Sequence, residues 1–110
     1  MKVAYLLESA RAFDILHDMI VPQMEEKRHG ATVVGMMFFF DNTFIIRAGD
    51  PLGERINDLS RETGMLVMGC DRCCYARGID KHLISTAKMG CFPDVYAALG
   101  QVGVDQVITL

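Results

Sequence analysis

The fold of this chain is decided around one stretch, Met65-Leu66-Val67-Met68-Gly69-Cys70-Asp71-Arg72-Cys73-Cys74-Tyr75-Ala76-Arg77-Gly78. Its first four residues are apolar, which predicts a short buried strand. Three of the four cysteines of the chain follow within five positions, accompanied by Arg72 and Arg77. Open α/β sheets bind their ligands beyond the carboxyl ends of their strands. We therefore expect the cysteines to form the functional site and the rest of the chain to hold it.

Four apolar blocks predict strands, and they lie at residues 3–7, 31–40, 65–68 and 105–110. The segments between them carry helical spacing and helix-ending residues. Asp50-Pro51 is a strong helix start, and Gly64 ends that helix. Strands that alternate with helices through short connections indicate right-handed βαβ units. We therefore predict one domain over residues 1–110, an α/β fold of three layers (α/β/α) with a mostly parallel sheet of four to five strands.

A first helix is predicted between the first two strands, with Ser9 as its N-cap and Gly30 just beyond its end. Pro22 falls inside this helix and is expected to kink or split it, because proline has no backbone donor. The apolar residues expected to face the core are Phe13, Leu16, Ile20 and Met24.

Two more helices are predicted after the cysteine stretch. One is expected over residues 80–90 with Asp80 as its cap, and the other from residue 93 to residue 100 or 103. Phe44-Ile45-Ile46 predicts either a short strand or an ordered loop. This second apolar block lies close to the strand at 31–40, so it belongs either to the core or to a subunit interface.

Composition and charge exclude several classes of function. Apolar residues make up 51% and charged residues 23% of the 110-residue chain. These fractions are close to those of an ordinary soluble domain, with slightly more apolar residues for the core. The net charge is −3 and there is no basic run, so nucleic acid and anionic membranes are poor partners. The apolar run near the N-terminus is five residues long, too short for a signal peptide or a spanning helix. We expect a cytoplasmic protein whose cysteines are reduced thiols.

Cys70 is the candidate nucleophile because it follows a strand and precedes a predicted helical turn. Helix N-termini and nearby cations lower the pKa of a thiol below its ordinary value of about 8.5. Arg72 and Arg77 can supply the positive charge, while Asp71 opposes them. We expect the pKa of Cys70 to be lowered, which would favour the attack of its thiolate on an electrophilic sulfur and the formation of a persulfide.

The remaining cysteines are assigned different roles. Cys70 and Cys73 form a Cys-x-x-Cys pair, so Cys73 could resolve a persulfide or sulfenate on Cys70 through an intramolecular disulfide. Cys74 is expected to point away from Cys73, as a small buried residue, because neighbours on a helix diverge by about 100°. Cys91 precedes Phe92-Pro93 and is expected to serve in packing.

A zinc site is the alternative interpretation of the same residues. Cys70 and Cys73 could be completed to a tetrahedral set by one of Cys74, His82 or Cys91. Structural zinc sites normally show two pairs of ligands, whereas this chain shows one cluster and no second pair. Our first expectation is therefore a protein without a metal cofactor.

The sequence resembles the DsrE/DsrF-like family of small sulfur-handling proteins. The most specific match is the spacing Cys70-x-x-Cys73-x-x-x-Arg77-Gly78. The matching features along the rest of the chain are the strand at 3–7, Phe38-Phe39-Phe40, Ile79 after Gly78, Ala97-Ala98-Leu99 and the strand at 105–110. Many members of the family lack a cysteine at position 73, and the extra Cys74 is unusual.

The resemblance implies a three-layer α/β fold and assembly into homo- or hetero-oligomers, commonly trimers or hexamers. It also implies that the cysteine at position 70 carries a persulfide in a sulfur relay. We therefore predict a cytoplasmic sulfur carrier, sulfurtransferase-like at most, in which Arg72, Cys74 and Gly78 support Cys70, Cys73 and Arg77. Its partners would be sulfur-donor and sulfur-acceptor proteins or small sulfur species. The alternatives are a zinc-type thiolate module, a dithiol redox module, and a structural subunit with an inert Cys70.

Overall fold

Five parallel strands form the central sheet of the computed structural model, which describes residues 1–110. The strands are β1 (Lys2–Leu7), β2 (Thr32–Phe38), β3 (Leu66–Cys70), β4 (Ala87–Gly90) and β5 (Gln106–Thr109). Their order across the sheet is β4-β3-β2-β1-β5, and every neighbouring pair is parallel. The predicted α/β fold is confirmed, with β4 as a strand that the sequence patterns did not indicate.

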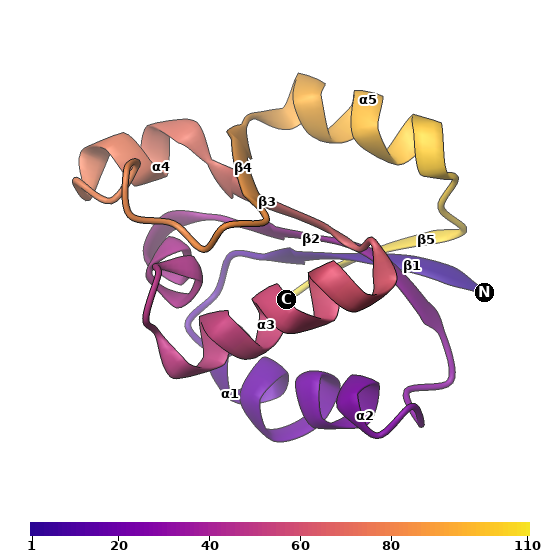
Figure 1. The fold of residues 1–110 in the computed structure, drawn as a ribbon. Helices are drawn as coiled ribbons and strands as arrows, with labels where there is room; N and C mark the ends of the chain where they lie inside the picture. Colours follow the sequence, from indigo (N-terminus) through magenta and orange to yellow (C-terminus); the bar gives the residue numbers. More distant parts are fainter.

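Helices cover both faces of this sheet (Figure 1). One face carries α1 (Ala12–Ile15), the π-helical segment Leu16–Ile20, α2 (Val21–Glu25) and α3 (Pro51–Thr63). The other face carries α4 (Asp71–Ala76) and α5 (Phe92–Val102). A 3-10 helix, Phe40–Ile46, follows β2 at the carboxyl edge of the sheet. The three predicted layers are therefore present.

The first helical region is split near Pro22, as the sequence predicts. Its N-cap residue and the residues on its buried side differ from the prediction. A π-turn precedes α2, and Pro22 lies in the first turn of α2, where its missing donor costs little. The predicted cap is wrong, because the N-cap is Arg11 and Ser9 contributes only its backbone carbonyl, which accepts from Ala12. Phe13, predicted to face the core, is exposed and stacks on His17.

Helix α3 forms as predicted. The Asp50 side chain accepts a hydrogen bond from the Gly53 amide at 3.0 Å, and Gly64 ends the helix with a positive φ of 78°. The helix lies so close to the 3-10 segment that a Cβ atom on Gly53 would be 2.1 Å from the carbonyl oxygen of Ile45. Glycine is therefore required where this helix starts.

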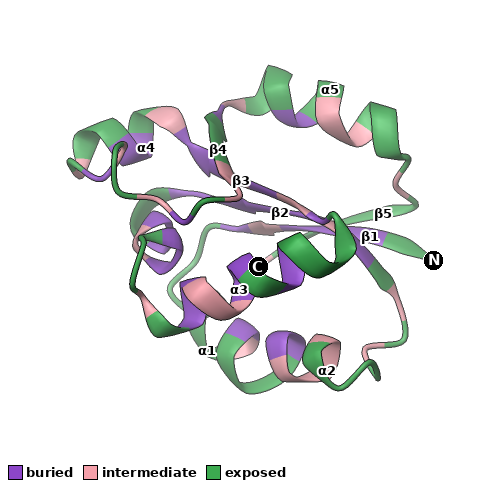
Figure 2. Cartoon of the chain, in the orientation of Figure 1, coloured by how far each residue is buried: buried purple, intermediate pink, exposed green.

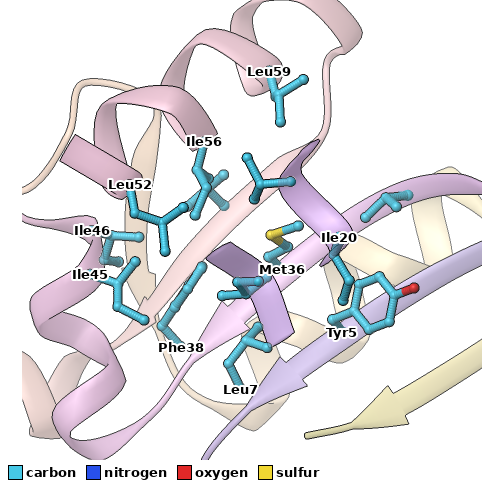
Figure 3. Packing of buried hydrophobic residues seen from close by; sticks show 14 of the residues in the cluster. Tyr5, Leu7, Ile20, Met36, Phe38, Ile45, Ile46, Leu52, Ile56 and Leu59 are labelled. Carbon is cyan, nitrogen blue, oxygen red and sulfur yellow. The ribbon is translucent and has the colours of Figure 1, made fainter. Parts of the chain in front are cut away.

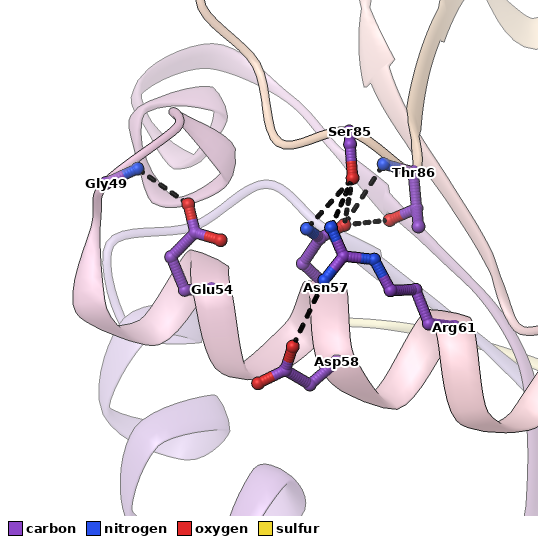
Figure 4. Close-up of polar contacts among 7 residues, drawn as sticks. All are labelled: Gly49, Glu54, Asn57, Asp58, Arg61, Ser85 and Thr86. Carbon is purple, nitrogen blue, oxygen red and sulfur yellow. Dashed lines mark hydrogen bonds and ion pairs between the residues drawn. The ribbon is translucent and has the colours of Figure 1, made fainter.

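The predicted helix over residues 80–90 is wrong. Residues 77–86 form turns and a loop, and β4 follows at once. The loop is held by Asn57, a buried residue of α3, whose side-chain oxygen accepts from the Thr86 amide at 3.0 Å and from its hydroxyl at 2.6 Å (Figure 4). The Asn57 amide and the Arg61 guanidinium both donate to the Ser85 hydroxyl. These contacts fix the turn at residues 85 and 86, after which β4 begins, and override the local helical pattern.

The two faces of the sheet bury very different amounts of apolar side chain (Figures 2 and 3). Eighteen buried residues from β1, β2, β3 and the helices of the α1–α3 face form one cluster, which includes Leu7, Phe38, Ile45, Ile46 and Ile56. Burial of Ile45 and Ile46 confirms that the block after β2 belongs to the core. The cluster on the α4/α5 face has five buried members, Met37, Phe39, Cys70, Cys73 and Val95. None of the helices has the length and apolar character needed to cross a bilayer.

Candidate functional site

Cys70 lies where the sequence analysis placed it, at the junction of a strand and a helix. It is the last residue of β3 and the N-cap residue of α4. Its partner on the neighbouring strand is Gly90, the last residue of β4, and the preceding Gly69 pairs with Phe38 at the end of β2. The thiol therefore belongs to the carboxyl edge of the sheet, beside the ends of two other strands.

Cys73 lies one turn into α4 and forms a close pair with Cys70. Both side chains belong to the cluster of the α4/α5 face, and the nearby Cys73 thiol is one of the causes that raise the pKa of Cys70. The structure shows both as free thiols. A Cys-x-x-Cys pair that spans the first turn of a helix has the spacing of dithiols that interconvert with a disulfide.

The expectation of a lowered pKa at Cys70 is wrong. Only 6% of the residue is exposed, and burial is the main cause that raises the pKa of its thiol, followed by the contact with the Cys73 thiol. The backbone amides of Cys73 and Arg72 act in the opposite direction and are outweighed. Neither guanidinium is among the causes of this shift, and that of Arg77 pairs with Asp41. Desolvation therefore dominates over the helix start.

Cys74 is fully buried, and the prediction that it points inward is confirmed. Its sulfur would be 3.2 Å from a Cβ atom on Gly69, which shows how closely it packs against the end of β3. Burial, followed by the nearby Cys70 and Cys73, raises the pKa of Cys74 to about 11. This thiol is protonated near neutral pH and inert as a nucleophile.

Arg77 supports the backbone around the thiols. Its guanidinium donates to Asp41 at 2.9 Å and to the carbonyl oxygen of Cys73 at 3.3 Å, so it ties α4 to the 3-10 segment. Gly78 has a positive φ of 65° and turns the chain away at the end of α4. Arg72 is exposed, and only its backbone amide takes part in the hydrogen bonds of this region.

The residues proposed as further metal ligands are not assembled. Cys91 is half-buried at the N-cap of α5, where its side chain accepts from the Asp94 amide and its own amide donates to the Asp94 carboxylate at 2.8 Å. His82 is exposed in the loop before β4. No group of three or more His, Cys, Asp or Glu side chains in the chain is arranged to hold a metal ion.

An aromatic strip borders the thiol pair and was missed by the sequence analysis. We define it by Phe40, Phe39, Phe92 and Tyr96, whose successive ring centroids are 6.4, 5.2 and 6.2 Å apart. Phe39 is buried beside the cysteines, while Phe40 and Tyr96 are 55% and 68% exposed. Phe40 also has a φ of 53°, which is strained for a side chain of this size. The signal in the sequence was the run of three phenylalanines at the end of a strand.

Three solved structures share this fold along nearly their whole length. The ychN protein from E. coli has a TM-score of 0.71 and 16% identity, with 100% of this chain and 99% of that chain covered. A conserved protein of unknown function from Bacteroides thetaiotaomicron has a TM-score of 0.69 and 13% identity, with 99% and 94% covered. A protein of unknown function from Methanobacterium thermoautotrophicum has a TM-score of 0.67 and 10% identity, with 97% of both chains covered.

These likenesses establish the fold. Fold alone does not imply function, so the chemistry has to be argued from the residues of this chain. No family model matches the sequence. No curated protein matches it either. What the chain presents is a parallel α/β fold with a buried dithiol at the carboxyl edge of its sheet.

Proposed function

We propose that this protein handles sulfane sulfur, with Cys70 as the residue that accepts a sulfur atom as a persulfide. The observation that carries the proposal is the position of Cys70 at the end of β3 and the start of α4, in contact with a second thiol. The carboxyl edge of a parallel sheet is where α/β proteins carry their chemistry. The spacing Cys70-x-x-Cys73-x-x-x-Arg77-Gly78 supports a relation to the DsrE/DsrF-like sulfur-relay proteins.

Burial of Cys70 sets a condition on this chemistry. The thiolate is the reacting form, and desolvation keeps most of the thiol protonated near neutral pH. The thiolate that does form is the stronger nucleophile, because intrinsic nucleophilicity rises with pKa. Loading of Cys70 is therefore expected to be slow near neutral pH and to accelerate as the pH rises.

The surface around the thiols supports donor or acceptor partners that dock beside Cys70. The aromatic strip exposes Phe40 and Tyr96 next to the buried pair, and aromatic side chains are enriched where proteins meet. We propose small sulfur species or sulfur-carrying proteins as partners, a homo-oligomer as the working assembly, and the cytoplasm as the compartment that keeps these thiols reduced.

Incubation with inorganic polysulfide followed by intact-mass and peptide analysis tests the acceptor role. We expect one or more sulfur atoms on the peptide that carries Cys70, either retained or already exchanged for a new disulfide, and Cys70→Ser should abolish both products. Cys91→Ser is the matched control, because serine retains the helix cap that Cys91 provides in α5. A wild-type protein that gains no sulfur and forms no new disulfide would overturn the proposal.

A dithiol redox module without sulfur transfer is the second candidate, and the contact between Cys70 and Cys73 favours it. The two functions differ in what they exchange. A redox module would form the Cys70–Cys73 disulfide with thiol–disulfide reagents and would neither retain sulfur from polysulfide in Cys73→Ser nor release sulfide. Sulfur on Cys70 in that variant would support the first function.

A further inference from the structure

We propose that Cys73 attacks the sulfur of a loaded Cys70, so that the protein releases the accepted sulfur as hydrosulfide instead of passing it on as a persulfide. This inference rests on the proposed function, in which Cys70 is the acceptor. It assigns a reductase activity toward sulfane sulfur, with persulfides and polysulfides as the substrate class. A dithiol reductant would be the second co-reactant.

The contact between the two side chains decides which sulfur atom Cys73 reaches. The turn that separates the two residues in α4, and the buried cluster that both share, place Cys73 beside the sulfur that belongs to Cys70 itself, and that atom becomes the inner sulfur of the persulfide. Both residues are held in the same buried cluster by Met37, Phe39 and Val95. Attack on the inner sulfur expels the outer one, whereas transfer onward would require a thiol placed at the outer sulfur.

The helical geometry favours the same outcome. Cys70 is the N-cap residue and Cys73 the third residue of α4, so the two are separated by one turn at a fixed distance along the chain. Arg77 donates to the Cys73 carbonyl and to Asp41, which fixes the end of that turn. A nucleophile held in place reacts as if it were present at very high concentration. Resolution within the chain should therefore outrun the arrival of an external acceptor at a buried persulfide.

The other two cysteines are not positioned for this step. Cys74 is fully buried and packs closely against the end of β3 at Gly69. The Cys91 side chain is engaged at the start of α5, where it accepts from the Asp94 amide. Cys73 is therefore the residue assigned to resolve the persulfide.

Two balanced steps describe the reaction. In the first, the Cys70 thiolate attacks the sulfane sulfur of a donor R–S–SH, forming a new S–S bond while the donor's S–S bond breaks and RS⁻ leaves to take up a proton. In the second, the Cys73 thiolate attacks the Cys70 sulfur, the disulfide forms, and the electron pair of the broken bond leaves with the outer sulfur as HS⁻. The proton lost by Cys73 goes to the solvent or to the departing HS⁻.

Electrons balance in the same way. The sulfane sulfur is reduced by two electrons to sulfide, and the two thiols are oxidised to a Cys70–Cys73 disulfide. One chain therefore releases one hydrosulfide per round from a persulfide donor. A dithiol reductant returns two electrons to the disulfide and allows the next round.

The experiment compares wild type with Cys73→Ser and Cys73→Ala after anaerobic reduction and addition of glutathione persulfide. We expect wild type to release sulfide without added reductant and to end as the Cys70–Cys73 disulfide, found by peptide mapping. Both variants should keep a persulfide on Cys70 and release sulfide at a rate lower by at least about tenfold, because the held nucleophile is missing. Added dithiothreitol should then free the trapped sulfur from the variants. Cys91→Ser should behave as wild type.

The possible failures are distinguishable. A wild-type protein that retains its persulfide as long as Cys73→Ser does would overturn the inference and leave the acceptor role of Cys70 intact. Absence of a persulfide from both Cys73 variants, with both folded by thermal unfolding, would overturn the acceptor role itself. Release of sulfide from Cys73→Ala at the wild-type rate would assign the step to another group and overturn the inference.

Discussion

The two faces of the sheet differ in what they bury and in what they expose. The α1–α3 face holds the cluster of eighteen buried residues, whereas the α4/α5 face holds five, two of them cysteines. The same thinner face exposes aromatic side chains, among them Phe92 and Tyr96, and much of α5 is exposed (Figure 2). The larger buried core therefore lies on one side of the sheet, and the other side carries the cysteine pair of the proposed site. Functional regions are commonly drawn from the less stable part of a structure.

Consecutive methionines of β2 offer the sharpest test of this comparison. Met36 and Met37 are 2% and 3% exposed and point to opposite faces, Met36 into the large cluster and Met37 into the small one. We expect Met36→Ala to lower the free energy of unfolding by about 4 kcal/mol and Met37→Ala by about 2 kcal/mol. The difference should arise because the thinly covered face can relax around the smaller side chain. Urea denaturation measures both.

Equal losses from the two substitutions would break the comparison, since the faces would then contribute alike despite their different depth. A larger loss for Met37→Ala would invert it. Met19→Ala serves as the control, because Met19 is exposed on the first helical region and contributes to neither cluster. That substitution should change the free energy of unfolding by no more than about 0.5 kcal/mol.

The second prediction concerns Asn57, through which the α1–α3 face holds the loop that leads to β4. We expect Asn57→Ala to lower the free energy of unfolding by about 2–3 kcal/mol, because the Thr86 amide and hydroxyl lose their acceptor. Hydrogen exchange should accelerate at β4 before it does at β1. Exchange measured by mass spectrometry reports both effects.

Asp58→Ala is the matched control for Asn57→Ala. Asp58 is the next residue of α3, is exposed, and pairs only with Arg61 at 3.4 Å. An exposed ion pair of this kind contributes little, so its loss should be near zero. Uniform acceleration of exchange across the sheet in Asn57→Ala would show that the contact stabilises the whole fold and not the loop alone.

This contact also explains where sequence prediction succeeded and where it failed. β1, β2, β3, β5 and α3 were predictable because each follows from local signals, either an apolar run or a cap such as Asp50-Pro51. β4 was not, because the turn at residues 85 and 86 from which it starts is held by Asn57, a residue nearly thirty positions earlier in the chain. No periodicity within residues 80–90 carries that information.

The position of the site was predictable from the sequence, but the direction of the pKa shift at Cys70 was not. Cys70 after a strand, Cys73 beside it and Cys74 turned inward all follow from spacing. The direction of the pKa shift depends on how deeply a thiol is covered, which is a property of the packed α4/α5 face. Burial by distant residues such as Val95 therefore outweighed the backbone amides at the helix start.

The third prediction follows from that burial and concerns the reactivity of Cys70 on the α4/α5 face. Burial raises the pKa of Cys70 above that of an ordinary thiol, so its rate of alkylation by iodoacetamide should still increase about tenfold per pH unit between pH 7 and pH 9. Peptide mapping after timed labelling isolates this cysteine. Cys91, half-buried and outside the thiol pair, provides the internal reference.

A rate at Cys70 that reaches its plateau below pH 8 would contradict the dominance of burial. Cys73→Ser sharpens the result, because contact with the Cys73 thiol also raises the pKa of Cys70. Its removal should move the titration of Cys70 to lower pH. Cys74, with a pKa of about 11, should stay unlabelled throughout this range.

The last and smallest effect belongs to the α1–α3 face and concerns its stability as the pH falls below neutral. Tyr5 donates its hydroxyl to Nε2 of His29 at 2.8 Å, and Nδ1–H of His29 donates to Gln23 at 2.9 Å, so the imidazole is held neutral. Burial lowers the pKa of His29 below 6.5. The stabilisation is therefore complete above pH 6.5 and is lost as the pH falls through the lower pKa of the folded protein.

We expect the loss to amount to less than about 1 kcal/mol, because His29 is partly exposed and Tyr5 can still accept if it no longer donates. Urea denaturation between pH 7 and pH 5 measures it, above the range in which the Glu25 carboxylate, with its lowered pKa, titrates. His29→Gln should flatten the profile, while His17→Gln, at an exposed position, should leave it unchanged. A wild-type protein more stable at pH 5 than at pH 7 would mean that protonated His29 finds a better partner than Tyr5, and that this face too contains a titrating site.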